Sequence, residues 1–459
     1  MESAPLPTIP SASSASSAPP TPPNAPVAPE ENANGHALPP HWKGAIALIW
    51  SGQAASILAT CAATFAVLWY ITTTANSALM LSLAGIAALL PVAVLSPLGG
   101  VAADRFNKKI VMIVADGTAG VFSLVLAGVV LALGDGISPF LLLGLLAARA
   151  SAQAFHGTAL MALMPELVPE RDMVRINTLD QTLSSVSAII GPVLGIALYT
   201  AWGFVAVLVM DAAAAAFACL CLAAAKLPYA RSVAVSSGSV VGDMRDGLVV
   251  FGRDHAMVTL LVMVMLAMLL FLPLGTLSPL LTYDWFGGDG FAASLVEAAA
   301  GVGLLAGSVV MLVWGGGRRL VAVLVGAGLV VGAGCIVCGL LPHGAFPLYV
   351  ALIGVVFAAT AAFNAPVIPL MQKRVPPEKF GRVMGLFGSL TALASPVGLA
   401  LAGPAAEALG VNRWFVVCGV LLCAAMIVAR LSRTVRSLDE VGAAEAPDGA
   451  EARSAENAA

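Results

Sequence analysis

The sequence predicts an all-α membrane protein with twelve transmembrane helices in two pseudo-symmetric six-helix halves. Three observations lead to this fold class: an apolar composition, twelve apolar runs and an internal repeat. Of the 459 residues, 59% are hydrophobic and 10% are charged, whereas a soluble globular domain has about 25% charged residues. So few polar residues cannot cover a water-exposed surface, and the mean hydropathy of +0.95 indicates that the lipid bilayer is the main solvent.

Each apolar run has about 20 residues or more, enough to cross roughly 30 Å of hydrocarbon. The expected spans are 44–71, 78–103, 110–133, 139–164, 175–199, 203–225, 256–282, 291–314, 320–341, 346–371, 380–406 and 413–433. The longer connection at 226–255 is expected to be a cytoplasmic loop between an N-terminal half (44–225) and a C-terminal half (256–433). Polar composition predicts disordered cytoplasmic tails at 1–43 and 434–459.

The positively charged residues give the chain a direction. With the N-terminus in the cytoplasm, twenty of the 22 Lys and Arg residues fall on the cytoplasmic side. They are Lys43, Arg105, Lys108, Lys109, Arg171, Arg175, Lys226, Arg231, Arg245, Arg253, Arg318, Arg319, Lys373, Arg374, Lys379, Arg382, Arg430, Arg433, Arg436 and Arg453. Arg413 lies outside and Arg149 lies within a span. By the positive-inside rule, we expect a multi-pass protein of the plasma or inner membrane with both termini cytoplasmic.

The two halves carry a sequence repeat. Val168, Pro169 and Arg175 follow span 4 with the same spacing as Val375, Pro376 and Arg382 after span 10, and Pro192-Val193 corresponds to Pro396-Val397. Two six-helix halves in the same membrane orientation imply a pseudo-twofold axis along the membrane normal. A binding site is then expected between the halves, near the middle of the membrane.

The connection between spans 2 and 3 reads GGVAADRFNKK (99–109). It resembles the loop 2–3 signature of the major facilitator superfamily, G-x-x-x-D-R-x-G-R-[RK], through Gly100, Asp104, Arg105, Lys108 and Lys109. Asn107 replaces the second glycine. The resemblance implies the major facilitator fold and a conformational latch, in which Asp104 faces the positive end of the span 11 helix dipole. The alternative is a solvated basic loop. The related segment GGGRR (315–319) lacks the aspartate, so the latch is expected to be one-sided.

Three further segments resemble the macrolide-efflux and siderophore-exporter branch of that superfamily: IWSGQAAS (49–56), GPVLG (191–195) and the stretch at 284–308. The resemblance implies a secondary active transporter that exports a small amphipathic compound, a drug or a siderophore, by alternating access. Gly191, Pro192 and Gly195 are expected to kink span 5 and to allow close packing.

Other functions remain as alternatives. One is an uptake permease of the same fold, and another is a transport-inactive membrane sensor or an intramembrane enzyme. The sequence has no Walker A, H-E-x-x-H or G-x-S-x-G motif, so we expect no enzymatic activity and no cofactor. The net charge of −3 gives no indication of a nucleic-acid partner. We expect a monomer whose partners are a small-molecule substrate and protons.

Ionisable residues within spans are costly and usually mark function. Arg149 occupies the position of the span 4 arginine that, in the resembled family, couples proton and drug movement, although the following Gln-Gly is displaced. The alternative is an arginine paired for packing. Asp211, Glu297 and Asp116 are the carboxylates that could carry the proton, because an apolar environment favours the protonated form and a nearby arginine favours the ionised form. Asp116 could instead support the latch.

Uncharged polar residues could line a substrate cavity or could bond neighbouring helices. They are Gln53, Ser56, Thr60, Asn177, Gln181 and Asn364. The first three share one helical face. His156 is expected to be a satisfied interior histidine rather than a proton relay. Cys335 and Cys338 form a C-x-x-C, which we interpret as small packing residues, with a metal or redox site as the alternative.

Overall fold

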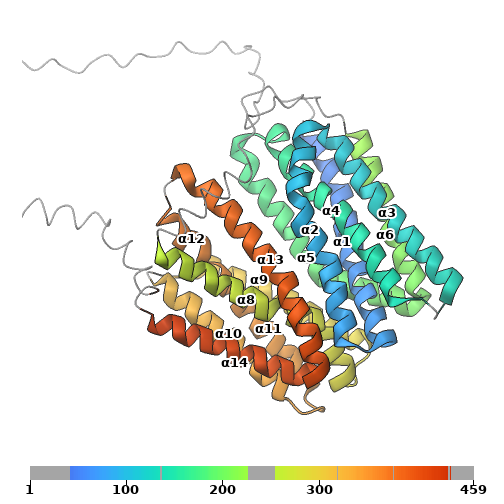
Figure 1. Ribbon diagram of the computed structural model, residues 1–459. Coiled ribbons are helices and arrows are strands. Elements are labelled where there is room, and N and C mark those ends of the chain that lie inside the picture. Colours follow the sequence, from blue (N-terminus) through green and yellow to red (C-terminus); the bar gives the residue numbers. More distant parts are fainter. Residues whose placement is uncertain are drawn as a thin grey trace, which may run out of the picture.

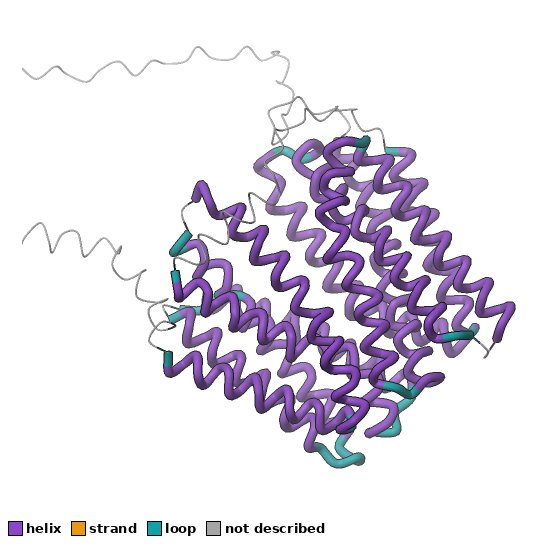
Figure 2. The backbone as a smooth tube through the Cα atoms, viewed as in Figure 1, coloured by secondary structure: helices purple, strands orange, loops and turns teal. Residues whose placement is uncertain are grey.

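The computed structural model describes residues 42–134, 137–225, 254–317, 319–375, 377–432 and 435. All regular elements among them are helical (Figure 2). They are α1 (Trp42–Ala75), α2 (Ala78–Arg105), α3 (Lys108–Leu133), α4 (Pro139–Leu167), α5 (Glu170–Trp202), α6 (Phe204–Ala224), α8 (His255–Leu280), the π-helix η2 (Leu281–Trp285), α9 (Gly290–Trp314), α10 (Leu320–Leu340), α11 (Phe346–Asn364), α12 (Val367–Gln372), α13 (Pro377–Leu409) and α14 (Val411–Leu431). The predicted tails and central loop lie almost wholly outside the described residues.

The helix lengths and compositions confirm the predicted fold class. In the described chain, eleven helical segments are long and apolar enough to cross a membrane, with α8 and η2 forming one segment and α11 and α12 another. The twelfth position belongs to α4, whose 29 residues are also long enough. Arg149, Gln153 and His156 make this helix more polar. The break between α11 and α12 falls at Pro366, which lacks the N–H that would continue the helical hydrogen bonds.

The two halves have the same internal packing, as the repeat predicts (Figure 1). In the first half α1 packs on α5 and α6, α2 packs on α4, and α3 packs on α4 and α6. In the second half α8 packs on α13 and α14, α9 packs on α11, and α10 packs on α11 and α14. The halves meet through α2 against α13 and α5 against α9, which are equivalent pairs under the pseudo-twofold. Helix-to-helix packing is thus duplicated.

The halves are held together mainly near the predicted external end of the bundle. Gly85 and Ser82 on α2 lie against Leu399 and Gly403 on α13, and Gly301 on α9 lies against Ile189 on α5. Towards the opposite end, where α12 lies and α13 begins, the two groups of helices diverge (Figures 1 and 2). Given the orientation expected from the cations, this arrangement is closed on the outside.

A carboxylate from one half caps a helix of the other at this closed end. Glu407, near the end of α13, accepts hydrogen bonds through Oε2 from Ser77 Oγ and from the backbone N–H of Leu79, both at 3.1 Å. Ser77 is itself the N-cap of α2 and accepts from the Met80 N–H at 3.3 Å. The first N–H groups of a helix lack partners within that helix, and its N-terminus attracts negative charge. Glu407 therefore favours closure.

Replacing Glu407 by glutamine is expected to shift the protein towards an externally open state by about two- to fivefold, since a carboxylate at an exposed helix N-terminus contributes about 0.3–1 kcal/mol. The shift can be measured as the distance distribution between spin labels at Thr74 and Gly344, which are exposed on different halves at this end. Cysteine-free protein in lipid is required because seven native cysteines are present. An unchanged distribution would show that the capping contact does not influence closure.

Candidate functional site: two buried polar layers

Polar side chains of the first half meet at two levels inside the bundle. On each of three helices the two levels are seven residues apart, which places both residues on one helical face and separates them by about 10 Å. These pairs are Gln53 and Thr60 on α1, Asp116 and Ser123 on α3, and His156 and Arg149 on α4. We call Thr60, Ser123, Arg149 and the α6 residue Asp211 the outer layer. Gln53, Asp116 and His156 are the inner layer, closer to the predicted cytoplasmic end.

The outer layer is an ion pair whose carboxylate is fully hydrogen-bonded. Arg149 Nη2 lies 2.8 Å from Oδ1 and 2.9 Å from Oδ2 of Asp211. Ser123 Oγ donates to Asp211 Oδ2 at 2.6 Å. Thr60 Oγ1 accepts from Arg149 at 3.0 Å and donates to Asp211 Oδ1 at 3.4 Å. Charge-assisted hydrogen bonds of this kind are stronger than neutral ones, so the layer joins α1, α3, α4 and α6 firmly.

The inner layer contains a carboxyl and an imidazole with far fewer partners. Asp116 Oδ2 lies 3.5 Å from His156 Nε2, and Gln53 Nε2 lies 3.1 Å from the same nitrogen. All three side chains are buried. Asp116 Oδ2 makes no hydrogen bond within the described structure. No Lys or Arg of the described chain forms an ion pair with this layer, so its charge depends on its protons. The interior histidine expected from the sequence therefore has a titratable neighbour.

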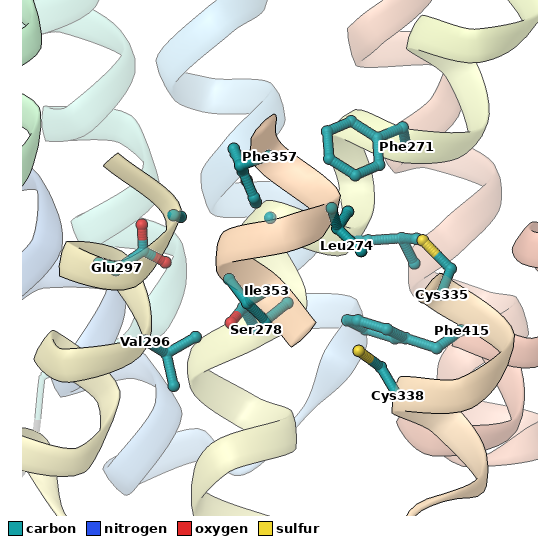
Figure 3. A pocket seen from close by; sticks show the side chains of 13 residues that line it. Phe271, Leu274, Ser278, Val296, Glu297, Cys335, Cys338, Ile353, Phe357 and Phe415 are labelled. Carbon is teal, nitrogen blue, oxygen red and sulfur yellow. The ribbon is translucent and has the colours of Figure 1, made fainter. Parts of the chain in front are cut away.

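Glu297 lies in the other half and does not join these layers. It is half-buried on α9 and lines a cavity together with Phe271, Phe357, Ser278 and the cysteines of the C-x-x-C (Figure 3). The cavity volume of about 20 Å³ is enough for one water molecule but not for a drug. Among the described residues, none forms a hydrogen bond or ion pair with Glu297. The cavity beside Glu297 therefore has room for a water molecule in this conformation, but not for a large ligand.

The residues of the predicted latch bind mostly within their own half. Lys108 Nζ forms an ion pair with Glu166 Oε1 at 2.8 Å. Lys109 Nζ donates to the carbonyls of Ala223 and Ala225, both at 2.9 Å, at the end of α6. A cation is favourable there because the last carbonyls of a helix lack partners. These lysines therefore tie α3 to α4 and α6, which the sequence did not reveal.

Asp104 and Arg105 are exposed at the end of α2. The start of α13, which Asp104 is predicted to face, includes side chains outside the described residues, so the latch contact stays a prediction. Gly100 makes no close helix approach in this conformation, because a Cβ there would meet nothing within 4 Å. The neighbouring Gly99 makes the approach instead, against Thr158 and the backbone of α4.

An ion pair that the sequence did not predict lies at the predicted cytoplasmic end of the C-terminal half. Arg374 Nη1, in the turn between α12 and α13, donates to Asp254 Oδ2 at 2.8 Å. Asp254 also caps α8 by accepting from the Ala256 N–H. Partial burial acts to raise the pKa of Asp254, but the hydrogen bonds from Arg374 and Ala256 outweigh it and hold the pKa below its ordinary value. The carboxylate form, and with it this contact, is lost only as the pH falls through that lowered pKa.

The remaining predicted polar residues are dispersed. Ser56 is half-buried, whereas Asn177, Gln181 and Asn364 are exposed. Asn364 donates to the Thr360 carbonyl of its own helix. The structure does not bring these residues together with Gln53 and Thr60, which belong to the two layers. Their role in binding substrate therefore stays a prediction.

The GPVLG segment serves close packing of α5 on α1. A Cβ at Gly191 would collide with Cys61, and one at Gly195 would collide with the backbone of Ala62. Pro192 lies inside the continuous helix α5. The close approach predicted from the two glycines is thus present, and the kink stays a prediction.

Cys335 and Cys338 are buried on α10. In the part of the chain that the structure describes, no group of three or more His, Cys, Asp or Glu residues could hold a metal ion. The interpretation of this C-x-x-C as packing residues is compatible with that arrangement.

Comparison with known proteins gives a family and a fold. The family model of the Major Facilitator Superfamily matches residues 49–398. Macrolide efflux protein A of Streptococcus pyogenes is 30% identical over 400 residues, covering 87% of this chain and 98% of that protein. Multidrug efflux pump Tap of Mycobacterium tuberculosis is 28% identical over 388 residues, covering 81% of this chain and 89% of that protein.

Solved structures show the same fold at low sequence identity. The crystal structure of nucleoside transporter NupG gives a TM-score of 0.65 at 15% identity, covering 84% of this chain and 100% of that one. The structure of a bacterial homolog of the human lysosomal transporter Spinster, in an inward-facing and unoccupied conformation, gives a TM-score of 0.66 at 15% identity, covering 88% of this chain and 98% of that one.

Proposed function

Because the chain belongs to the Major Facilitator Superfamily, whose members are transporters rather than enzymes, we propose that it is a proton-coupled exporter of small amphipathic compounds. The observation that supports coupling of transport to protons is the pair of buried polar layers. Buried ionisable groups inside a membrane bundle are costly unless they serve a function. Four of them, Asp116, Arg149, His156 and Asp211, are concentrated in the first half.

The direction and the substrate class rest on the relatives. Two proteins that align with most of this chain carry names that describe efflux, of macrolides in one case and of several drugs in the other. A macrolide is a small-molecule drug that is mostly apolar and has polar substituents. We therefore propose that this chain moves amphipathic compounds of that kind from the cytoplasmic side to the outside. A siderophore remains a second possible substrate, on the sequence resemblance alone.

Transport would proceed by alternating access between the two halves. In the arrangement described above the external end is closed, with Glu407 capping α2. For export, the substrate would enter from the diverging end, and the halves would then part externally. In that second arrangement the divergent end would close, and Asp104 could reach the start of α13 to act as the predicted latch.

The proposal can be tested in everted membrane vesicles that contain the protein. Acidification of the vesicle interior is expected to drive accumulation of a radiolabelled macrolide, because an exporter in this orientation pumps inward in exchange for protons. A protonophore should abolish the accumulation, and vesicles without the protein should show none.

Failure to accumulate a panel of macrolides, other amphipathic drugs and siderophores under this gradient would overturn the proposal. Gradient-driven movement of substrate in the opposite direction would instead identify an uptake permease.

A further inference from the structure

The two polar layers lie on the same faces of α1, α3 and α4, but they differ in charge. The outer layer contains the ion pair of Arg149 and Asp211. The inner layer contains Asp116 and His156 without a lysine or arginine partner in the described structure. We propose that the inner layer is the site that takes up and releases the transported proton, with Asp116 and His156 holding the proton and Gln53 positioning the imidazole. The outer layer is then a permanent ion pair. This inference rests on the proposed function and assigns the proton to one site among the buried carboxyls.

The outer layer is a poor place to exchange a proton. Asp211 receives a guanidinium and two hydroxyls within 3.4 Å. Protonation of this carboxylate would leave the largely buried Arg149 without its counter-charge. Breaking a buried ion pair is strongly destabilising, because one charge is left uncompensated. A site that must be loaded and emptied in every cycle cannot carry such a penalty at each loading.

The inner layer has a different proton balance. With one proton, Asp116 and His156 are neutral together, whether that proton is on the carboxyl or on the imidazole. Release of this proton leaves one negative charge, and no lysine or arginine in the described structure pairs with it. The charge state of the layer therefore changes by one with each proton, which is what a coupling site requires.

Gln53 indicates where the shared proton lies. Its amide nitrogen can only donate, and it lies 3.1 Å from His156 Nε2. In the orientation that the structure gives to the Gln53 amide, His156 Nε2 acts as an acceptor and carries no proton, so the imidazole is neutral. When the layer holds its proton in this arrangement, the proton is on Asp116, whose Oδ2 faces the same nitrogen at 3.5 Å. Transfer to Nε2 would require the Gln53 amide to turn and present its oxygen.

Few other titratable groups face the site. From α6, Cys219 lies beside α3 and donates through Sγ to the Ile113 carbonyl at 3.4 Å. Asp211, also on α6, interacts electrostatically with Asp116 but is neutralised by Arg149. From α4 only His156 faces the site, and α1 contributes the uncharged Gln53. Lys108 on α3 lies two turns away, about 12 Å along the helix, and is paired with Glu166.

The position of the inner layer suits proton release. It lies on the cytoplasmic side of the outer layer, and the structure is closed at the other end. An exporter that exchanges substrate for protons must release its proton to the cytoplasm when the cytoplasmic side is open. Asp116 and His156 are therefore on the correct side of the membrane for this step, with the ion pair of the outer layer between them and the outside.

A spectroscopic test does not depend on knowing the substrate. Infrared difference spectra of the full-length protein in lipid, recorded during a pH titration, should contain the C=O band of a protonated carboxyl. Asp116→Asn should remove the component of that band that comes from the inner layer, and Asp284→Asn, which alters an exposed carboxyl at the external end, should leave that component unchanged. A titration of Asp116→Asn with the same C=O components as the wild type would overturn the inference. His156→Gln should move the titration midpoint of the inner-layer component by about one pH unit or more, and an unchanged midpoint would also overturn it.

A transport test separates this inference from the proposed function. Asp116→Asn should lose gradient-driven accumulation of the radiolabelled macrolide but keep exchange of labelled for unlabelled macrolide without a gradient. Accumulation equal to that of the wild type would overturn the inference and leave the proposed function intact. No accumulation by the wild type would overturn the proposed function, while the infrared band would still decide whether Asp116 titrates. If Asp116→Asn does not fold, the His156→Gln midpoint decides.

Discussion

Replacing Arg149 by alanine is expected to abolish transport and to destabilise the protein by about 3–5 kcal/mol, the usual cost of removing one partner of a buried ion pair. The substitution leaves Asp211 buried with two hydroxyl donors and no cation. It also removes the group that joins α4 to α1 through Thr60. The measurements are gradient-driven accumulation in everted vesicles and thermal unfolding of the detergent-solubilised protein.

The double variant Arg149→Ala/Asp211→Asn is the matched control. Removing the unpaired charge as well should restore much of the stability, because the cost arises from the isolated carboxylate rather than from lost packing. Transport should remain absent if the pair itself is needed for the conformational change. Normal transport by Arg149→Ala would show that the outer layer has no part in the transport cycle.

Replacing Gly195 by leucine is expected to prevent correct assembly of the first half. A Cβ at this position would collide with the backbone of Ala62 on α1, and a backbone cannot move aside as a flexible side chain can. Gly191 and Gly195 form a G-x-x-x-G on α5, the arrangement that allows two transmembrane helices to pack closely. Overpacking usually costs about 1–3 kcal/mol, and this contact is between backbones, so we expect the upper end of that range or more.

The loss should appear as a smaller monodisperse fraction in size-exclusion chromatography of detergent extracts, together with a lower unfolding temperature. Gly128→Leu on α3 is the control, because nothing lies within 4 Å of a Cβ at Gly128. It introduces the same side chain into the same half and should behave like the wild type. Equal behaviour of the two leucine variants would show that α5 can separate from α1 at little cost.

The fold could be predicted from sequence because its determinants are repeated many times along the chain. Each span is long and apolar, and cations mark one end of successive connections, so errors at single positions do not change the result. The duplication of the halves could also be predicted, since Val168 and Pro169 recur as Val375 and Pro376. Among the described long helices α4 departs from the pattern, because Arg149, Gln153 and His156 make it more polar.

The candidate site could be predicted from the sequence only in part. Arg149, Asp211 and Asp116 were singled out because charges in apolar runs are rare, but their partners depend on how each helix is rotated in the bundle. One sequence does not contain those rotations. His156 was therefore interpreted as a satisfied interior histidine rather than a proton relay, and its position facing Asp116 was not predicted. Glu407 gave no signal at all, since an acidic residue at the end of a span looks like any exposed loop residue.

The contact of Glu407 with α2 has a consequence for how the external side opens. The Leu79 N–H obtains its acceptor from the opposite half, so the first turn of α2 is complete only while the halves touch. When they part, that amide must turn to water and the turn can fray. The order of the first turn of α2 and the position of one half relative to the other therefore change together. We expect the hydrogen-exchange rate of the Leu79 amide to report whether the external side is open or closed.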